Sequence, residues 1–276
     1  LEPSEEEGVE GLIDQYAVRR LIARGGMGLV FEALDRGLLR KVAIKVLIPQ
    51  LAASEQSRAR FLREARAVAA IDHEHVLPIH AVGEAKGFPY LVMPLVEGES
   101  LHALLRREGA LPIGELVRIA LAAAKGLAAA HERDLVHRDI KPDNVLLEAD
   151  GGRVWLADFG LARAVDERDL TRTGLLAGTP QFSSPEQAGG EEVDLRTDLF
   201  SFGSLLYVMA TGTPPFDGES ALAVLRKITD SEAPSLVEKR PDLPPALVAL
   251  VEELLAKDPA GRPAGAGEIV ARLEPL

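Results

Sequence analysis

Short apolar segments dominate the first part of the chain and predict β-strands. Hydrophobic residues gather at residues 18–22, 29–33, 42–46 and 88–93, with β-branched residues at many of these positions. Three glycines separate the first two segments, and Gly37 lies before the third. This pattern predicts a strand-rich first part in which glycines separate the segments.

One helical pattern interrupts these strands. Ser54 is a suitable N-cap, and Phe61, Ala65 and Val68 follow at helical spacing. Arginines occupy other positions of the same segment, and most of them are interpreted as a solvent-exposed face: Arg58, Arg60, Arg63 and Arg66.

Beyond Pro94 the apolar residues change to helical spacing. Helices are predicted at residues 116–131, 199–210, 246–256 and 267–273, with proline pairs between them. Residues 94–99 form a short join that includes Gly98. The pattern therefore predicts a small, strand-rich first part and a larger, helical second part.

Length, cysteine content and charge narrow the class of protein. A chain of 276 residues suits one domain, or one domain in two lobes. Cysteine is absent, which excludes disulfides, thiolate nucleophiles and cysteine zinc sites. The net charge is −12, and residues 1–14 hold six acidic residues and no basic one. These features predict an acidic arm or linker and argue against a general nucleic-acid binder.

The sequence predicts neither a signal peptide at its acidic start nor a membrane-spanning helix. The acidic start lacks the basic and apolar regions of a signal peptide. The best apolar stretch, residues 202–210, is less than half of the about 20 residues that a spanning helix needs. It is interpreted as a buried core helix.

Two segments in the strand-rich part carry groups that suit a phosphate ligand. Gly25, Gly26 and Gly28 lie between two strands, where backbone N–H groups can approach phosphate oxygens, although such a hairpin is often only a turn. Lys45 stands in an apolar strand and must meet an anion or reach water, as an edge-strand lysine would. Ala43 shares its face, and Glu64 is a candidate counter-charge.

A denser set of ionisable residues follows in the helical part. In His137-Arg138-Asp139-Ile140-Lys141-Pro142-Asp143-Asn144, an aspartate can orient a hydroxyl or accept its proton, and a lysine can neutralise a phosphate. Asn144 can ligate a hard cation through oxygen. Asp158 ends an apolar strand before a glycine and suits Mg²⁺.

Taken in order, these segments resemble the signature set of protein kinases. The set comprises the glycine loop, Val42-Ala43-Ile44-Lys45, a helical Glu64, the segment around Asp139, Asp158-Phe159-Gly160 and Ser184-Pro185-Glu186. The resemblance covers residues 16–273 and is strongest to bacterial serine/threonine kinases of the eukaryotic type. It implies an α+β, bilobal fold. After an arm at 1–15, a small antiparallel β-sheet lobe with one key helix (16–93) would precede a larger, mainly α-helical lobe (94–273).

The resemblance also implies an activity and its cofactors. The chain would transfer the γ-phosphoryl group of ATP to serine or threonine hydroxyls, with Mg²⁺, or Mn²⁺ in its place. Asp139 would orient the attacking hydroxyl and accept its proton, and Lys141 would offset charge on the phosphoryl group. Lys45 would hold the α- and β-phosphates and pair with Glu64. The metal would be held by Asn144 and Asp158, and the phosphates would be covered by Gly25, Gly26 and Gly28.

The adenine site follows from the same resemblance. Met93 would be the gatekeeper, the carbonyl of Pro94 would accept from the adenine amino group, and Val96 would supply a backbone N–H. The ring would be sandwiched by Val30, Ala43 and Leu146. For each apolar residue, plain core packing is the alternative interpretation.

The resemblance also implies a substrate preference, through Lys141 and Thr179, and a regulatory switch in the segment after Asp158. Lys141 is typical of serine/threonine kinases, and Thr179 would bridge it to Asp139. Phosphorylation of Thr171 or Thr173 would switch the kinase on by pairing with arginines. The candidates for that pairing are Arg138, Arg163 and Arg60. A mobile polar loop without a switch is the alternative.

Other matches imply structural roles. Glu186 is expected to pair with Arg262, and Asp198 to anchor the backbone near Asp139. A stack is expected from Val68, Ile79, His137 and Phe159. The sequence departs from the pattern at Ala23, which replaces the first loop glycine and would strain the loop if that position needs φ > 0. Asp134 replaces a glycine that relatives often have, and Phe182 a tyrosine.

Two other functions remain open at this point. The first is a catalytically inactive kinase fold that acts as a scaffold or binding module, and the second is a small-molecule kinase of related fold. The expected partners are proteins with serine or threonine acceptors, including a second copy of the chain acting in trans, and neither nucleic acid nor a membrane. The expected location is the cytoplasm, either alone or as the intracellular domain of a longer membrane-anchored protein.

Overall fold

The computed structural model describes residue 1 and residues 8–26, 28–159 and 180–276. These residues fall into two compact units. The first unit contains the described residues up to 72 together with residues 77–97. The second contains residues 73–76 and 98–159 together with residues 180–276. Apart from the excursion at residues 73–76, the chain passes from the first unit to the second at residues 97–98, inside the predicted join.

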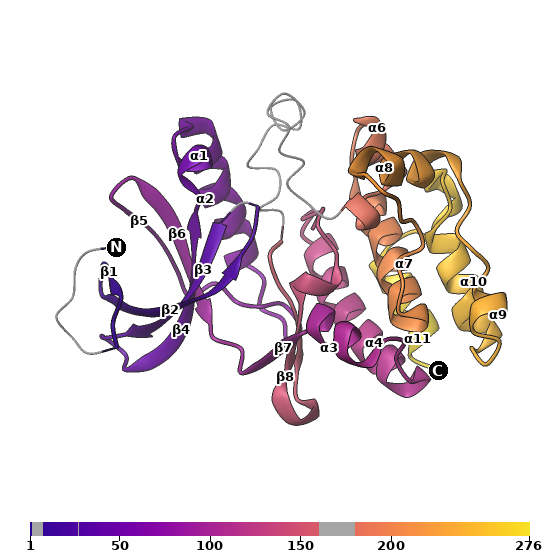
Figure 1. The fold of residues 1–276 in the computed structure, drawn as a ribbon, viewed down its shortest axis with the longest axis horizontal. Coiled ribbons are helices and arrows are strands. Elements are labelled where there is room, and N and C mark those ends of the chain that lie inside the picture. Colours follow the sequence, from indigo (N-terminus) through magenta and orange to yellow (C-terminus); the bar gives the residue numbers. More distant parts are fainter. Residues whose placement is uncertain (2–7, 27, 160–179) are drawn as a thin grey trace. The chain divides into compact units, whose positions relative to one another are not determined.

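A six-stranded antiparallel sheet forms the first unit. Its order is β1-β2-β3-β4-β6-β5, as Figure 1 shows in indigo and purple. The strands are β1 (Gly11–Ile13), β2 (Tyr16–Arg24), β3 (Gly28–Asp35), β4 (Arg40–Leu47), β5 (Ala81–Ala85) and β6 (Phe88–Pro94). β1 lies in residues that charge alone assigned to the acidic arm, and it pairs with β2.

Two helices accompany this sheet, α1 (Pro49–Ala52) and α2 (Glu55–Ala69). The Ser54 hydroxyl accepts a hydrogen bond from the Ser57 N–H at 3.3 Å, so Ser54 is the N-cap of α2 as predicted. The predicted apolar stripe is buried, and α2 packs against β5 and β6. This packing fixes the helix that carries Glu64 on the sheet that carries Lys45.

The second unit is mainly helical and contains a small antiparallel sheet, β7-β8-β9. Its strands are β7 (Gly98–Ser100), β8 (Val145–Glu148) and β9 (Val154–Leu156). Its helices are α3 (Leu101–Glu108), α4 (Ile113–His131), α6 (Pro185–Gly189), α7 (Leu195–Thr211), α8 (Ala221–Asp230), α9 (Leu236–Lys239), α10 (Pro245–Leu254) and α11 (Ala266–Leu273). A 3₁₀ turn, η1 (Pro142–Asn144), precedes β8.

Helix α7 forms the centre of the second unit. All of its residues from Thr197 to Ala210 are buried, and it packs against α4 and α10. A Cβ at Gly203 would lie 2.8 Å from the Leu254 Cβ, so the glycine permits the close approach of α7 to α10. No helix within the described ranges combines the length and the apolar character needed to cross a membrane.

The predicted fold class is confirmed. The first unit is an antiparallel sheet with one long helix, and the second is a larger, mainly helical unit. Helices predicted at residues 116–131, 199–210, 246–256 and 267–273 correspond to α4, α7, α10 and α11.

Candidate functional site

Lys45 lies on one face of the first sheet with three of the residues predicted to surround adenine. It is opposite Val30 on β3, while Ala43 is opposite Met93 on β6. Residues that pair across antiparallel strands share a face, as do residues two apart on one strand. Val30, Ala43, Lys45 and Met93 therefore share a face. Lys45 is only 8% exposed on the central strand β4, which excludes the alternative of an edge lysine in solvent.

The glycine hairpin, residues 23–28, joins β2 to β3. The Gly25 N–H donates to the Gly28 carbonyl at 2.9 Å. A Cβ at Gly28 would lie 2.6 Å from the Val46 carbonyl oxygen, whereas a Cβ at Gly25 would meet nothing closer than 3.8 Å. Gly28 is therefore required by the packing of β3 on β4, while the fold itself does not require Gly25.

Ala23 does not strain the hairpin. It lies in β2 opposite Val30 and is not among the described residues with positive φ. The strain considered for an alanine at this position is therefore absent, because the position needs no left-handed backbone.

Glu64, Pro94 and Val96 also belong to the first unit. Glu64 lies within α2 and is half-buried, and Pro94 ends β6 opposite Val42. Val96 is half-buried in the join between β6 and β7. The pairing of Glu64 with Lys45 and the hinge contacts to adenine stay predictions.

Two predicted residues, Lys141 and Asn144, contact the carboxylate of Asp139. The Lys141 ammonium donates to its two oxygens at 2.9 and 2.7 Å. The Asn144 amide nitrogen donates to Oδ2 of Asp139 at 3.0 Å and to its carbonyl oxygen at 2.7 Å. The short turn η1 brings Asn144 back toward Asp139, where it is 5% exposed. Its amide orientation leaves the side-chain oxygen facing away from these bonds.

The backbone before Asp139 is held by a buried carboxylate on α7. Asp198, which is fully buried, accepts from the His137 N–H at 2.7 Å and from the Arg138 N–H at 2.6 Å. The predicted anchoring role of Asp198 is confirmed. His131, at the end of α4, adds a third contact of 2.9 Å through Nε2. Sequence analysis missed this residue, because its partner lies 67 residues away.

Arg138 adopts a left-handed backbone conformation, with φ of 65°. Such a conformation costs a non-glycine residue about 1–2 kcal/mol. The hydrogen bond to Asp198 offsets this cost and keeps the backbone in a turn that Arg138 would not adopt by preference.

His137 is a buried structural residue that contacts the backbone of Asp139. Its Nε2–H donates to the Ala157 carbonyl at 3.0 Å, and its Nδ1 accepts from the Asp139 N–H at 3.3 Å. Burial lowers the pKa of His137, so the ring is neutral at pH 7. It also packs on Phe159, with 4.4 Å between ring centroids, and these two residues are the members of the expected stack that lie in the second unit.

Asp158 follows β9, and the residue before it is hydrogen-bonded to the backbone of Asn144. The N–H of Ala157, the preceding residue, donates to the Asn144 carbonyl at 2.9 Å. Asp158 has φ of 62°, a left-handed conformation of the kind that clusters at functional sites. Leu146, predicted to contact adenine, lies in β8 opposite Trp155 and is half-buried.

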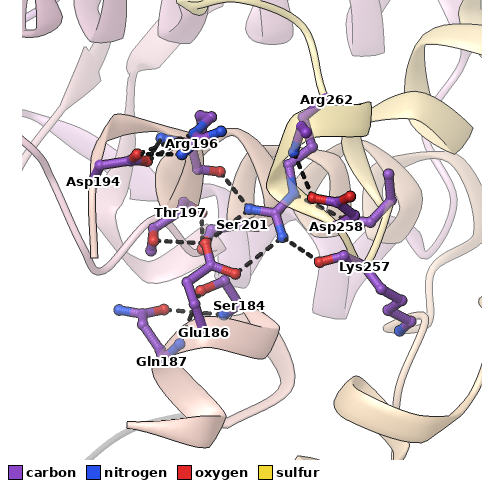
Figure 2. A network of polar contacts seen from close by, with 12 residues as sticks. Ser184, Glu186, Gln187, Asp194, Arg196, Thr197, Ser201, Lys257, Asp258 and Arg262 are labelled. Atoms are coloured by element: carbon purple, nitrogen blue, oxygen red, sulfur yellow. Dashed lines mark hydrogen bonds and ion pairs between the residues drawn. The ribbon is translucent and has the colours of Figure 1, made fainter. Parts of the chain in front are cut away.

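A buried ion pair holds α6 to Arg262, in the segment between α10 and α11, as predicted (Figure 2). The Arg262 guanidinium donates to both oxygens of Glu186, at 2.7 and 3.0 Å, and the Thr197 hydroxyl donates at 2.7 Å. Burial alone would raise the pKa of Glu186, but these hydrogen bonds outweigh it and hold the pKa below its usual value. The remaining donors of Arg262 bind the carbonyls of Arg196, Ala256 and Lys257.

Several predicted residues cannot be placed. Arg163, Thr171, Thr173 and Thr179 lie outside the described residues.

Asp134, a departure from the family pattern, has φ of 55°, which explains why a glycine suits this position.

Comparisons with known proteins agree with this geometry. Residues 16–272 match the family model of the protein kinase domain. Serine/threonine-protein kinase PknL of Mycobacterium tuberculosis is 40% identical over 265 residues, which is 96% of this chain and 66% of that protein. Serine/threonine-protein kinase pkn3 of Myxococcus xanthus is 38% identical over 270 residues, 94% of this chain and 49% of that protein.

The chain thus spans about half to two thirds of the length of these curated relatives. A crystal structure of the Mycobacterium tuberculosis PknI kinase domain matches over 99% of both chains, with 31% identity and a TM-score of 0.78. Because the family model and the solved structure both match along nearly the whole chain, this chain belongs to the protein kinase domain family.

Proposed function

We propose that this domain is a serine/threonine protein kinase that transfers the γ-phosphoryl group of MgATP to protein hydroxyls. One observation carries the proposal. The carboxylate of Asp139 lies between Lys141 and Asn144, on a backbone held by the buried Asp198. An inactive scaffold would have no need to keep this arrangement, so it supports an enzyme over the scaffold alternative.

Asp139 has the position and partners of a general base. It orients the substrate hydroxyl and accepts its proton as the oxygen forms a bond to the γ-phosphorus. The bond from that phosphorus to the β,γ-bridging oxygen breaks, and ADP leaves with its electrons. Lys141, already hydrogen-bonded to Asp139, offsets negative charge on the transferred group.

The nucleotide would bind along the face of the first sheet that carries Lys45. Val30 and Ala43 provide apolar contacts for adenine, with Met93 as the gatekeeper. Lys45 would hold the α- and β-phosphates, and Glu64 would pair with it. The remaining contacts would come from Pro94, Val96, Leu146 and the glycines Gly25, Gly26 and Gly28.

The residues present fit a divalent cation bound with the nucleotide. The amide nitrogen of Asn144 is engaged by Asp139, and no described residue donates a hydrogen bond to its side-chain oxygen. We propose that this oxygen and the Asp158 carboxylate hold Mg²⁺ or Mn²⁺, whose other ligands are phosphates and water. No cluster of three His, Cys, Asp or Glu suited to a metal occurs among residues 8–26, 28–159 and 180–276, and such a nucleotide-bound metal requires none. When bound, the ion neutralises charge on the phosphates.

The proposed substrates are proteins with serine or threonine hydroxyls, including a second copy of this chain. Thr179 would position the hydroxyl beside Lys141. Phosphorylation of Thr171 or Thr173 would activate the kinase by pairing with Arg138 and Arg163. We place this activity in the cytoplasm, in this chain alone or in a longer membrane-anchored protein.

Phosphoryl transfer tests the proposal directly. The unmodified chain is incubated with MgATP and a generic protein substrate, beside Asp139→Asn and Asp158→Asn, and intact mass and peptide mapping locate the phosphate. The control is Asp150→Asn, an exposed residue with φ of 58° that asparagine tolerates.

Phosphate on the unmodified chain and on the control, and none on the two site variants, is expected. Equal phosphorylation of Asp158→Asn would overturn the proposed metal site. Lack of transfer by every variant would favour the scaffold.

A further inference from the structure

Gln187, the third residue of α6, uses both ends of its side-chain amide. Its oxygen accepts from the Ser184 N–H at 3.0 Å, and the Ser184 hydroxyl accepts from the Gln187 N–H at 3.2 Å. This reciprocal pair is a capping box at the start of α6 (Figure 2). The amide nitrogen of Gln187 donates elsewhere, to the carbonyl oxygen of Arg138 at 3.0 Å.

That carbonyl belongs to the peptide group that joins Arg138 to Asp139. The N–H of the same peptide donates to Nδ1 of His137 at 3.3 Å. The preceding peptide is held by Asp198 through the Arg138 N–H. Side chains from three separate segments therefore hold the two peptide planes on either side of Arg138.

We propose that Gln187 is a positioning residue for phosphoryl transfer, because it holds the peptide plane from which the Asp139 side chain projects. The proposal rests on the proposed kinase function. Arg138 has φ of 65°, so its backbone would relax toward an ordinary conformation if the restraints were removed. Rotation of the 138–139 peptide would move the Asp139 carboxylate relative to a bound hydroxyl, and small misplacements of this kind are costly in rate.

The helix that carries Gln187 is itself held rigidly. The neighbouring Glu186 is bound by Arg262 and by Thr197 on α7. Helix α7 thus supports both partners of the Gln187–Arg138 contact. Its Thr197 binds the helix that carries Gln187, and its Asp198 binds the backbone at Arg138.

The capping role and the positioning role of Gln187 can be separated chemically. A capping box needs only an acceptor at this position, which glutamate supplies as well as glutamine. The contact to the Arg138 carbonyl needs a donor, which only glutamine has at neutral pH. The Gln187→Glu variant therefore keeps the cap and loses the contact, and Gln187→Met loses both without adding charge.

The experiment compares these two variants with Ser184→Ala and the unmodified chain. Ser184→Ala removes the hydroxyl of the cap and leaves the donor of Gln187 in place. Steady-state kinetics with MgATP and a protein substrate give kcat and KM for each. Hydrogen exchange of the peptide covering residues 135–141, in the nucleotide-free protein, reports on the backbone independently of activity.

For Gln187→Glu and Gln187→Met we expect kcat to fall about tenfold, with KM for ATP nearly unchanged and with faster exchange of the 137–139 amides. Ser184→Ala should lower the melting temperature and keep kcat within about twofold. Unchanged kcat in Gln187→Glu, or an equal loss in Ser184→Ala, would overturn the proposal. If the unmodified chain transfers no phosphate, the proposed function fails, and unchanged exchange in the Gln187 variants would separately refute the backbone contact.

Discussion

The glycine hairpin and the 136–144 loop carry the two halves of the proposed chemistry, but they are held in very different ways. The hairpin is defined by backbone pairing, from Ala23 opposite Val30 to the Gly25–Gly28 hydrogen bond. Arg24, Gly25 and Gly26 are exposed. In the 136–144 loop, by contrast, side chains from distant segments bind the backbone directly, above all Asp198 and Gln187.

This difference indicates that the 136–144 loop is preorganised and that the glycine hairpin is not. The 136–144 loop has its geometry without a ligand, since buried groups determine it, as transition-state stabilisation requires. Among its described residues the hairpin has no such side-chain contacts from distant segments, so under the proposed function a bound nucleotide would determine its conformation. The four changes below test this contrast.

Asp198→Ala should have the largest effect. It removes the acceptor of two buried backbone N–H groups, and we expect a loss of about 3–5 kcal/mol in the free energy of unfolding. Urea denaturation measures it. Asp194→Ala is the control, because Asp194 is the exposed N-cap of the same helix and its loss should cost only about 1 kcal/mol. Equal losses in the two variants would contradict the contrast.

Gly28→Ala should destabilise the protein more than Gly25→Ala. The new Cβ at Gly28 would lie 2.6 Å from the Val46 carbonyl, and strand β3 must shift to relieve this, at a cost of about 1–3 kcal/mol. At Gly25 a Cβ would make only an ordinary contact of 3.8 Å, and stability should stay within about 0.5 kcal/mol. Thermal unfolding of the nucleotide-free protein compares them. A loss at Gly25 as large as that at Gly28 would show that the hairpin is more constrained than its contacts indicate.

Low pH should weaken the ion pair of Glu186 with Arg262, which holds the helix that carries Gln187. The pKa of Glu186 is lowered in the folded state, so its contribution to stability is present above its unfolded pKa of about 4.3 and is lost as the pH falls through the folded value. We expect the free energy of unfolding to decline as the pH falls below about 5. Urea denaturation between about pH 3 and pH 7 measures the slope.

Glu186→Gln should reduce the steepness of this acid decline, because the residue no longer titrates. Glu192→Gln, at an exposed glutamate, is the matched control and should keep the slope of the unmodified chain. An unchanged slope in Glu186→Gln would show that other carboxyl groups account for the acid sensitivity.

Tyr207→Phe should have the smallest effect. Tyr207 lies on α7 like Asp198, but its buried hydroxyl has no hydrogen-bond partner among the described residues, and burial raises its pKa. Removal of an unpaired polar group is neutral or stabilising, so we expect a change between 0 and about +1 kcal/mol in the free energy of unfolding. Urea denaturation checks it. A loss above about 1 kcal/mol would indicate a buried water bound to the hydroxyl.

The long elements were predictable because each has enough residues to show a period. α2, α4, α10 and α11 were predicted from apolar spacing, and the Ser54 cap was predicted from its residue type. The start of α7 was missed, since this helix is buried all round and its polar Thr197, Asp198 and Ser201 conceal the pattern. Strand β7 has three residues, too few for any alternation to show, whereas β9, equally short, was predicted as the apolar strand before Asp158.

The candidate site was predicted in its residues but not in its contacts. Asp139, Lys141 and Asn144 lie within six positions of one another, so their meeting needs only a local turn. The Asp198 anchor was expected only through the family resemblance. His131 and Gln187 were missed, because their polar atoms serve partners that lie far away in sequence.

The sequence by itself determined the class of fold and the family, and it predicted the chemistry-bearing residues, because these depend on residue type and short spacing. Only the tertiary structure decided that Lys45 is buried on a central strand, that Gly28 is needed for packing and that Gln187 reaches Arg138. The physical reason is separation along the chain. Gln187 and Arg138 are 49 positions apart, and Glu186 and Arg262 are 76 positions apart. Both contacts exist only once α7 has brought their segments together.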